Sequence, residues 1–301
     1  MDNSFPPKSD DDSDIDYNKA FSGLVVFRAS LLTEDNGRAG RRLPGLNIKL
    51  REWCCYSRSR RDFALLILYA KINNAEETEA SIRKKISISR NTLKTIVMEA
   101  VDLKIAIRHD NRVISVTAEF YDAYMKSYLR EWKMMDSESA KALSVAVKSL
   151  SQKYITMNVG NAIGKALEFS VLSRAETVKA ERKLKLSSVD ESDGLNLSSW
   201  AVVNSFNRDL LLLLMSAAIT DNHLTTGEIM KRLHVSRNAV KKALRLGIDS
   251  GFITASNGYS CSGEALRDYL NWHCAVFSSY SDDLLSASAI FYEYLAAKEI
   301  D

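Results

Sequence analysis

Proline is scarce in this chain, which has only three prolines among 301 residues. Its scarcity leaves no proline-rich segment. Few prolines together with frequent alanine, leucine, lysine and glutamate predict a helix-rich fold. Hydrophobic residues make up 46% of the chain and charged residues 26%, which is typical of a globular protein. The length suits two domains that each bury a core.

Cysteine and histidine are also rare, and neither shows the spacing of a metal site. Cys54, Cys55, Cys261 and Cys274 form no CxxC pair and no Cys/His ligand pattern, and the four histidines do not cluster. This predicts reduced thiols and no bound metal. No apolar run reaches the roughly 18 residues of a membrane helix, and no apolar leader follows the N-terminus, so we expect a cytoplasmic protein that makes no membrane contact. The run "LLLLLM" (210–215) fits a buried helix.

Catalytic motifs are missing too. The chain has no GxSxG, phosphate-loop, HExxH or paired-carboxylate pattern, which predicts that it is not an enzyme and needs no cofactor. Six aspartates lie among the first 16 residues, although the whole chain has a net charge of +3. The low apolar content of residues 1–16 predicts a disordered acidic tail, and the remainder is correspondingly more basic.

One stretch of the sequence occurs twice. "SISRNTLKTIV" (87–97) resembles "HVSRNAVKKAL" (234–244) at an offset of 147 residues, which is 236 − 89. At this offset 14 of the 42 positions from 53 to 94 are identical, which is one third of them. Unrelated sequences of average composition are expected to be identical at ~6% of positions. Trp53 then matches Trp200, and Arg61-Asp62 matches Arg208-Asp209. We therefore predict a tandem duplication with repeats at 17–150 and 151–301. The segment "NVGNAIGKAL" (158–167) is interpreted as a flexible junction.

Each repeat contains signals for two short helices followed by a hairpin. In the second repeat Thr225 and Glu228 have capping-box spacing before a helix over 226–233, and Ser236 stands at the N-cap of the next helix. Two short strands around an Asn-Gly turn and a helix from about Gly263 follow. The first repeat has helices at 78–86 and 89–103 and a hairpin that turns at Asp110-Asn111. This order is typical of a winged helix-turn-helix.

The second of these helices is the element that enters the DNA major groove in such folds. An Arg-Asn pair after the N-cap suits base edges or phosphates, and a basic hairpin tip suits the minor groove. A solvated, purely structural helix start is the alternative. The predicted DNA-binding residues are Ser89, Arg90, Asn91, Thr92, Lys94, Thr95, Lys84, Lys85, Arg108 and Arg112 in the first repeat, and Ser236, Arg237, Asn238, Lys241, Lys242 and Arg245 in the second.

On these motifs, both repeats resemble the winged-helix domain of MarR-type transcription regulators. Asp110, Arg112, Val116 and Thr117 match the wing of that family, whereas Gly258 replaces the arginine in the second wing. The resemblance implies flanking helices that pack against a partner subunit, and a small-molecule effector pocket between flanking and winged helices. The sequence shows no convergent polar cluster for such a pocket.

The expected fold is therefore mainly α with small β-hairpin wings (α+β). It consists of two tandem winged helix-turn-helix domains with flanking helices, which form a monomeric pseudo-dimer. The expected function is sequence-specific binding of double-stranded DNA in transcription regulation, as a repressor. A plasmid replication initiator with two winged helices, and a scaffold that does not bind DNA, remain alternatives. Trp53 and Trp200 are expected in the core, and Asp62 and Asp209 at the starts of helices.

Overall fold

The computed structural model describes residues 16–32, 42–187, 197, 200 and 205–297. The described chain is mainly helical, with two small antiparallel sheets, as the composition and patterning predict. Nearly all of the expected acidic tail lies outside the described residues. Asp16 is described, and its carboxylate caps the first helix by accepting a hydrogen bond from the Lys19 backbone N–H at 2.9 Å. Within these ranges no helix combines the length and the apolar character that crossing a bilayer requires.

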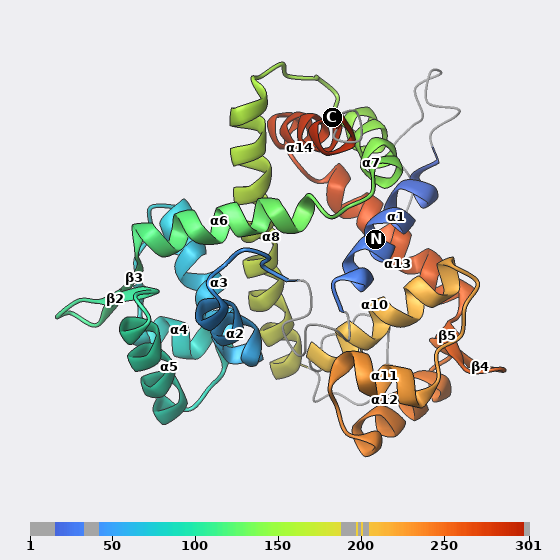
Figure 1. The fold of residues 1–301 in the computed structure, drawn as a ribbon, viewed down its shortest axis with the longest axis horizontal. Coiled ribbons are helices and arrows are strands. Elements are labelled where there is room, and N and C mark those ends of the chain that lie inside the picture. The colour runs from blue at the N-terminus through green and yellow to red at the C-terminus, as the bar shows by residue number, and fades with distance from the viewer. Residues whose placement is uncertain (1–15, 33–41, 188–196, 198–199, 201–204, 298–301) are drawn as a thin grey trace.

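The first half of the chain runs from α1 to α7 (Figure 1). Its elements are α1 (Tyr17–Ser30), α2 (Ile48–Tyr56), α3 (Arg58–Ile72), β1 (Glu77–Thr78), α4 (Glu79–Ile86), α5 (Arg90–Asp102), β2 (Ala106–Arg108), β3 (Val113–Val116), α6 (Ala118–Trp132) and α7 (Ser137–Ser149).

The second half repeats this order. Its elements are α8 (Val159–Ser187), α10 (Ser205–Ile219), α11 (Thr226–Leu233), α12 (Arg237–Asp249), β4 (Ile253–Ala255), β5 (Tyr259–Cys261), α13 (Gly263–Ser278) and α14 (Asp282–Ala296). Helices α3, α4 and α5 and strand β2 reappear with both bounds shifted by 147 residues, as α10, α11, α12 and β4 (205 − 58, 226 − 79, 237 − 90 and 253 − 106). The sequence repeat is therefore a repeat of structure.

The small sheets have the same topology in both halves. The first sheet has the strand order β1-β3-β2, with Glu77 opposite Ile114 and Ala106 opposite Val116. In the second half β4 pairs with β5, and a single antiparallel bridge from Leu224 to Tyr259 takes the place of β1. The third strand leaves no signal in the sequence, because two residues are too few to show an alternating pattern.

The two halves exchange their first helices. Helix α1 packs against α10 and α13 of the second half, and α8 packs against α3 and α6 of the first. Each of these helices also packs on the last helix of its own half, α1 on α7 and α8 on α14. The exchange is reciprocal, because each half is covered by the first helix of the other. In Figure 1, α7 and α14 lie together at one end of the molecule, away from α5 and α12.

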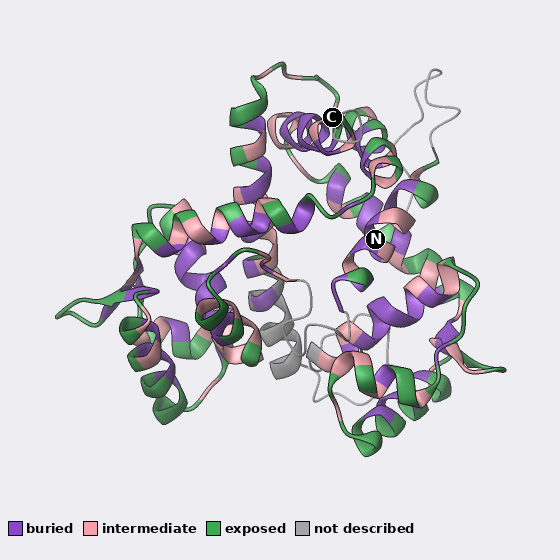
Figure 2. Ribbon diagram, in the orientation of Figure 1, coloured by how far each residue is buried: buried purple, intermediate pink, exposed green. Residues whose placement is uncertain are grey.

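The core is continuous between the halves, because a single cluster of buried side chains includes residues from both. Phe21 of α1 is fully buried, with its ring centroid 5.3 Å from that of Phe277 in α13. Figure 2 shows α14 buried over most of its length, where it packs on α7. The Ser144 hydroxyl of α7 donates to the Ala289 carbonyl of α14 at 3.0 Å. The shared core makes the stability of each half depend on the other.

Two local expectations need correction. Helix α3 begins at Arg58, four residues before Asp62, because the Ser57 hydroxyl accepts from the Arg60 N–H at 3.3 Å and caps the helix there. The segment 158–167 is the start of α8 and not a flexible junction, since the Asn158 side chain accepts from the Asn161 N–H at 2.8 Å.

Other expectations are confirmed. Trp53 and Trp200 are buried at 7% and 1% exposure. The "LLLLLM" run of α10 is buried throughout. All four cysteines are free thiols.

Candidate nucleic-acid interface

The helix pairs α4–α5 and α11–α12 are built by the same local interactions. In the first, Thr78 caps α4, Ser87 adopts the left-handed conformation (φ 49°), and the Ser89 hydroxyl accepts from the Thr92 N–H at 3.1 Å to begin α5. In the second, the Thr225/Glu228 capping box is present, as predicted from the sequence, and it begins α11. His234 then turns the chain with a φ of 51°, and Ser236 caps α12.

Each second helix turns an apolar face inward and a polar face outward. Leu93, Ile96, Val97 and Ala100 of α5 are buried, as are Val240, Ala243, Leu244 and Gly247 of α12. The predicted DNA-binding residues on both helices are all exposed. Among the described residues none is hydrogen-bonded to, or ion-paired with, the side chains of Arg90, Lys94, Arg237, Lys241 and Lys242. These cations are therefore available to a polyanion.

Several predicted residues are engaged within their own helix. The hydroxyls of Ser89 and Thr92 share a hydrogen bond of 2.8 Å, and the Thr95 hydroxyl donates to the Asn91 carbonyl at 3.2 Å. Arg245 lies 3.8 Å from Asp249, one turn further along α12. These three hydroxyls therefore support the geometry of α5, and the cationic and amide side chains are left as the candidates for base contacts.

Lys84 and Lys85 differ in a way that the sequence does not reveal. Lys84 is exposed, whereas Lys85 is half-buried and forms an ion pair with Glu77, which is 3% exposed. A buried carboxylate needs a counter-charge, so Lys85 has a structural role in joining α4 to β1. Only Lys84 is free to contact a phosphate.

The two hairpin tips also differ. Arg108 is held by Glu79 at 2.6 Å, while Arg112 lies at the tip with a φ of 62° and no ion pair among the described residues. Gly258 occupies the corresponding turn of the second hairpin with a φ of 131°, and the side chains around it are uncharged. The first tip thus carries one arginine without an ion pair in the described part of the chain, Arg112, close to Asp110 in the sequence, whereas the second tip carries no charged side chain.

Glu99 lies on α5, close to the candidate contacts, but it faces the body of the protein. Its carboxylate accepts two hydrogen bonds of 2.8 Å from the Arg60 guanidinium and one of 2.8 Å from the Trp53 indole. The hydrogen bonds from Arg60 lower the pKa of Glu99 below its ordinary value. Glu99 therefore positions α5 against α2 and α3, and does not neutralise Lys94.

The candidate residues of the two halves lie on the same side of the molecule. In Figure 1, α5 and α12 both lie on the side opposite α7 and α14, and the two hairpins extend from the outer edges. No described group of three or more His, Cys, Asp or Glu side chains is placed to hold a metal ion. Comparisons with protein-family models, curated proteins and solved structures find no match for this chain.

Proposed function

We propose that this chain is a transcription regulator that binds double-stranded DNA sequence-specifically, as a repressor. In this proposal the two halves are winged helix-turn-helix domains that form a pseudo-dimer within one chain, similar to a dimer of MarR-type regulators. Helices α5 and α12 enter successive major grooves, which lie about 34 Å apart on one face of B-DNA.

One observation carries the proposal. Two helices of equal length begin with a capping serine and present an Arg-Asn pair at the same positions, exposed and free of ion pairs. Stability does not require such side chains, because exposed cations contribute little to folding. Arginine and asparagine match the major-groove edges of guanine and adenine. The helix N-termini add a favourable site for phosphate.

The two reading helices are not identical, so the preferred DNA site is an imperfect palindrome. At the offset of 147 residues, Thr92 is matched by Ala239, Thr95 by Lys242 and Met98 by Arg245. The second helix is the more basic, while the hairpin tip that carries an arginine without an ion pair among the described residues, Arg112, belongs to the first half. We expect stronger phosphate contacts from α12 and minor-groove contact from the first wing.

The test begins with selection of bound genomic fragments, followed by affinity measurements on the selected site. Arg237→Ala weakens binding by about 1–3 kcal/mol and relaxes base preference if it pairs with a base. Lys141→Ala is the control, because Lys141 is exposed on α7, away from α5 and α12 (Figure 1). Raising the salt concentration weakens binding steeply. No measurable duplex affinity at low salt would favour the scaffold alternative.

Footprinting separates the regulator from the replication initiator. A regulator protects a single promoter site. An initiator protects a series of repeated sites at an origin. The two outcomes also differ in stoichiometry, since repeated sites load several chains on one fragment.

A further inference from the structure

One ion pair joins the two parts of the chain that carry the candidate nucleic-acid contacts. We call residues 42–116 the first head and residues 205–261 the second head. The Arg42 guanidinium, which precedes α2 in the first head, donates a hydrogen bond of 3.3 Å to the Asp209 carboxylate near the start of α10. The two side chains are 23% and 19% exposed. Salt therefore screens this pair less than it screens a pair on the open surface.

Both partners are held in place by helices. The Leu43 backbone N–H, next to Arg42, donates to the Glu131 carboxylate of α6 at 2.9 Å, and the Leu43 side chain is buried. Leu43 also turns the chain there with a φ of 50°. On the other side, Asp209 is followed directly by the buried run 210–215 of α10. A movement of one head relative to the other therefore has to stretch or break the pair.

The aspartate at the equivalent position of the first half has a partner in its own helix. Asp62 is 1% exposed and pairs with Arg58 at 3.2 Å, one turn earlier in α3. At the offset of 147 residues Ser205 takes the place of Arg58, and a serine brings no charge to Asp209. Asp209 pairs instead with an arginine of the other half. This exchange of partner ties the second head to the first.

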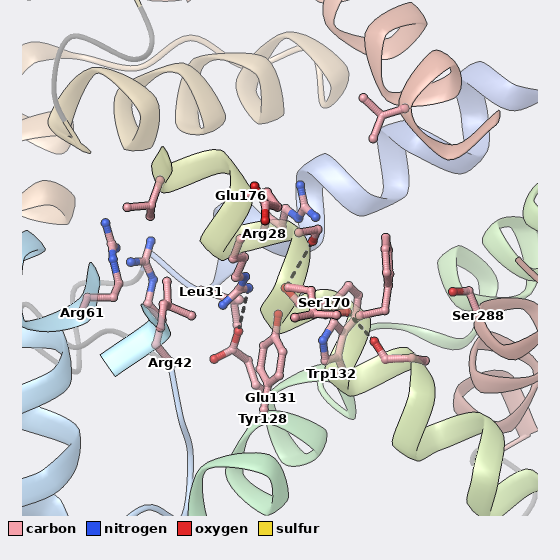
Figure 3. A pocket seen from close by; sticks show the side chains of 18 of the residues that line it. Arg28, Leu31, Arg42, Arg61, Tyr128, Glu131, Trp132, Ser170, Glu176 and Ser288 are labelled. Carbon is pink, nitrogen blue, oxygen red and sulfur yellow. Dashed lines mark hydrogen bonds and ion pairs between the residues drawn. The ribbon is translucent and has the colours of Figure 1, made fainter. Parts of the chain in front are cut away.

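The surroundings of Asp209 favour its charged form. Burial raises the pKa of its carboxyl, but the positive charges of Arg42, Arg61 and Arg208 outweigh burial and hold the pKa below its ordinary value. Figure 3 shows Arg42 and Arg61 side by side at one end of the cavity between the halves. Arg61 and Arg208 remain near Asp209 when Arg42 is replaced. The carboxylate then keeps part of its compensation, so we expect an Arg42 variant to fold.

The heads meet beside this pair with an open, polar junction. A hollow of about 150 Å³ lies there, lined by Tyr56 and Arg58 of the first head and by Arg232 and His234 of the second, among others. A space of this size admits several water molecules, since each occupies about 30 Å³ in the liquid. Close apolar packing does not fill this junction, and the directional contact across it is the ion pair.

We propose that the Arg42–Asp209 pair positions the two heads and fixes the separation and orientation of α5 relative to α12. The consequence for DNA rests on the proposed function: the pair then selects the spacing of the two half-sites. One added base pair moves a half-site by about 3.4 Å and rotates it by roughly 35° about the helix axis. Two helices held in a fixed arrangement distinguish such neighbouring spacings. Arg42 and Asp209 act through α5 and α12 and not by contact with bases.

The first test needs no DNA. Spin labels are attached at Val101→Cys and Ile248→Cys, which are equivalent exposed positions of α5 and α12. The native cysteines are buried or half-buried, and burial raises the pKa of their thiols, so the engineered thiols react first. We expect a single narrow distance distribution by double electron–electron resonance. Arg42→Gln shifts it to longer distances and widens it, and Arg42→Lys, which keeps the charge, changes it less.

Lys49→Gln is the matched control, because Lys49 is an exposed cation of the first head with no ion pair among the described residues. It should leave the distribution unchanged. The proposal is wrong if Arg42→Gln leaves the distances unchanged, or if Lys49→Gln changes them equally. If Arg42→Gln lowers the helical signal in circular dichroism, Asp209→Asn removes the same pair from the second head. Unchanged distances in that variant then contradict the proposal.

The second test uses the selected DNA site with one base pair inserted or deleted between its half-sites. The wild type should prefer one spacing, and Arg42→Gln should reduce this preference by about threefold, which is within the range for a partly exposed ion pair. An unchanged preference in a variant whose label distances have shifted would overturn the selection of spacing. Absence of duplex binding by the wild type would reject the proposed function, and the label distances would still decide whether the pair positions the heads.

Discussion

The Arg174 guanidinium lies 3.5 Å from the carboxylate of Glu131, and this ion pair joins α8 of the second half to α6 of the first. Glu131 also accepts a hydrogen bond of 2.9 Å from the Leu43 backbone N–H. Arg28 is the residue of α1 equivalent to Arg174. Helix α13 is offset from α6 by 145 residues, so the position equivalent to Glu131 is 276 (276 − 131 = 145), and this position holds a valine. Arg28 therefore has no equivalent glutamate. The ion pair is thus a point where the two halves differ.

Glu131→Ala is expected to destabilise the protein by about 3 kcal/mol, because it leaves Arg174 without its counter-charge and the Leu43 N–H without an acceptor. Urea unfolding at pH 7 measures the loss. Glu119→Ala is the control, since Glu119 is exposed on the same helix and has no ion pair among the described residues. It should cost less than about 1 kcal/mol. If both variants lost the same unfolding free energy, the ion pair between Arg174 and Glu131 would make no specific contribution to stability.

Neither half should fold alone as a monomer, because each half supplies the helix that covers the other. Phe21, Leu24 and Val25 of α1 are all fully buried, and α1 packs on α10 and α13. Expressed separately, 17–150 and 151–301 should show no cooperative thermal transition as monomers. Mixing them should restore the near-ultraviolet circular dichroism of the intact chain. A monomeric fragment that melts cooperatively would contradict this expectation.

Because His273 is buried in its neutral form, we expect the stability of the protein to fall in mild acid. The histidine is 4% exposed, and burial together with the nearby Arg28 charge lowers its pKa to about 3. The unfolded chain, whose histidine has a pKa near 6.5, then binds a proton that the folded chain excludes. The stabilisation is complete above about pH 6.5 and is lost as the pH falls towards 3.

The measurement compares unfolding free energies of the wild type and His273→Gln between pH 7 and pH 4. The wild type should lose about 3 kcal/mol more than the variant over this range, since one pKa unit corresponds to roughly 1.4 kcal/mol and the unfolded histidine alone is protonated between about pH 6.5 and pH 4. The other titrating groups are common to both chains and cancel in the comparison. Parallel pH profiles would show that His273 does not titrate differently on folding.

The sequence predicts the elements of this fold better than their packing. Ser236 and the Thr225/Glu228 pair mark helix starts through contacts within three residues, so the bounds of α11 and the start of α12 can be predicted almost to the residue. The apolar spacing of Val240, Ala243 and Leu244 likewise predicts the buried face of α12. Such signals are local, and they hold because tertiary packing agrees with them here.

Long-range arrangement leaves no comparable signal in one sequence. Nothing in the spacing of Phe21 shows that its partner is Phe277, or that α1 crosses to the other half. Nor does the sequence distinguish Lys84 from Lys85, since only the fold brings Glu77 to one of them. Arg28 of α1 and Arg174 of α8 line one cavity between the halves, and their convergence depends on the same packing.

Lys84 and Lys85 give a matched test of the candidate interface. Lys84→Ala should leave stability unchanged within about 0.5 kcal/mol and weaken DNA binding, with a salt slope reduced by about 1. Lys85→Ala should lower stability by about 2 kcal/mol, because Glu77 then remains buried without its partner. Thermal unfolding and fluorescence anisotropy at several salt concentrations separate the two effects. If Lys85→Ala weakened DNA binding and left stability unchanged, the assignment would be wrong and Lys85 would belong to the interface.

The packing of α12 on its hairpin offers a test of the duplication itself. A Cβ added to Gly247 would lie 2.3 Å from the Ile253 Cδ1. The equivalent positions in the first half are Ala100 and Ala106, and both alanines are buried. Each half thus fills the same space, one with Gly-Ile and the other with Ala-Ala. Gly247→Ala should destabilise by about 1 kcal/mol, since overpacking of roughly 2 kcal/mol exceeds the gain in helix propensity.

Ile253→Ala alone should cost about 3 kcal/mol through the cavity that it creates. The double variant restores the Ala-Ala pair of the first half, so its loss should be smaller than the sum of the single losses by at least about 1 kcal/mol. Gly164→Ala is the control: its added Cβ meets no atom within 4 Å, so it should be neutral or stabilising and additive with Ile253→Ala. Strict additivity in the Gly247/Ile253 pair would mean that the two positions do not share one packing space. The three single and two double variants are compared by urea unfolding, in which a constant slope shows that the unfolded states are alike.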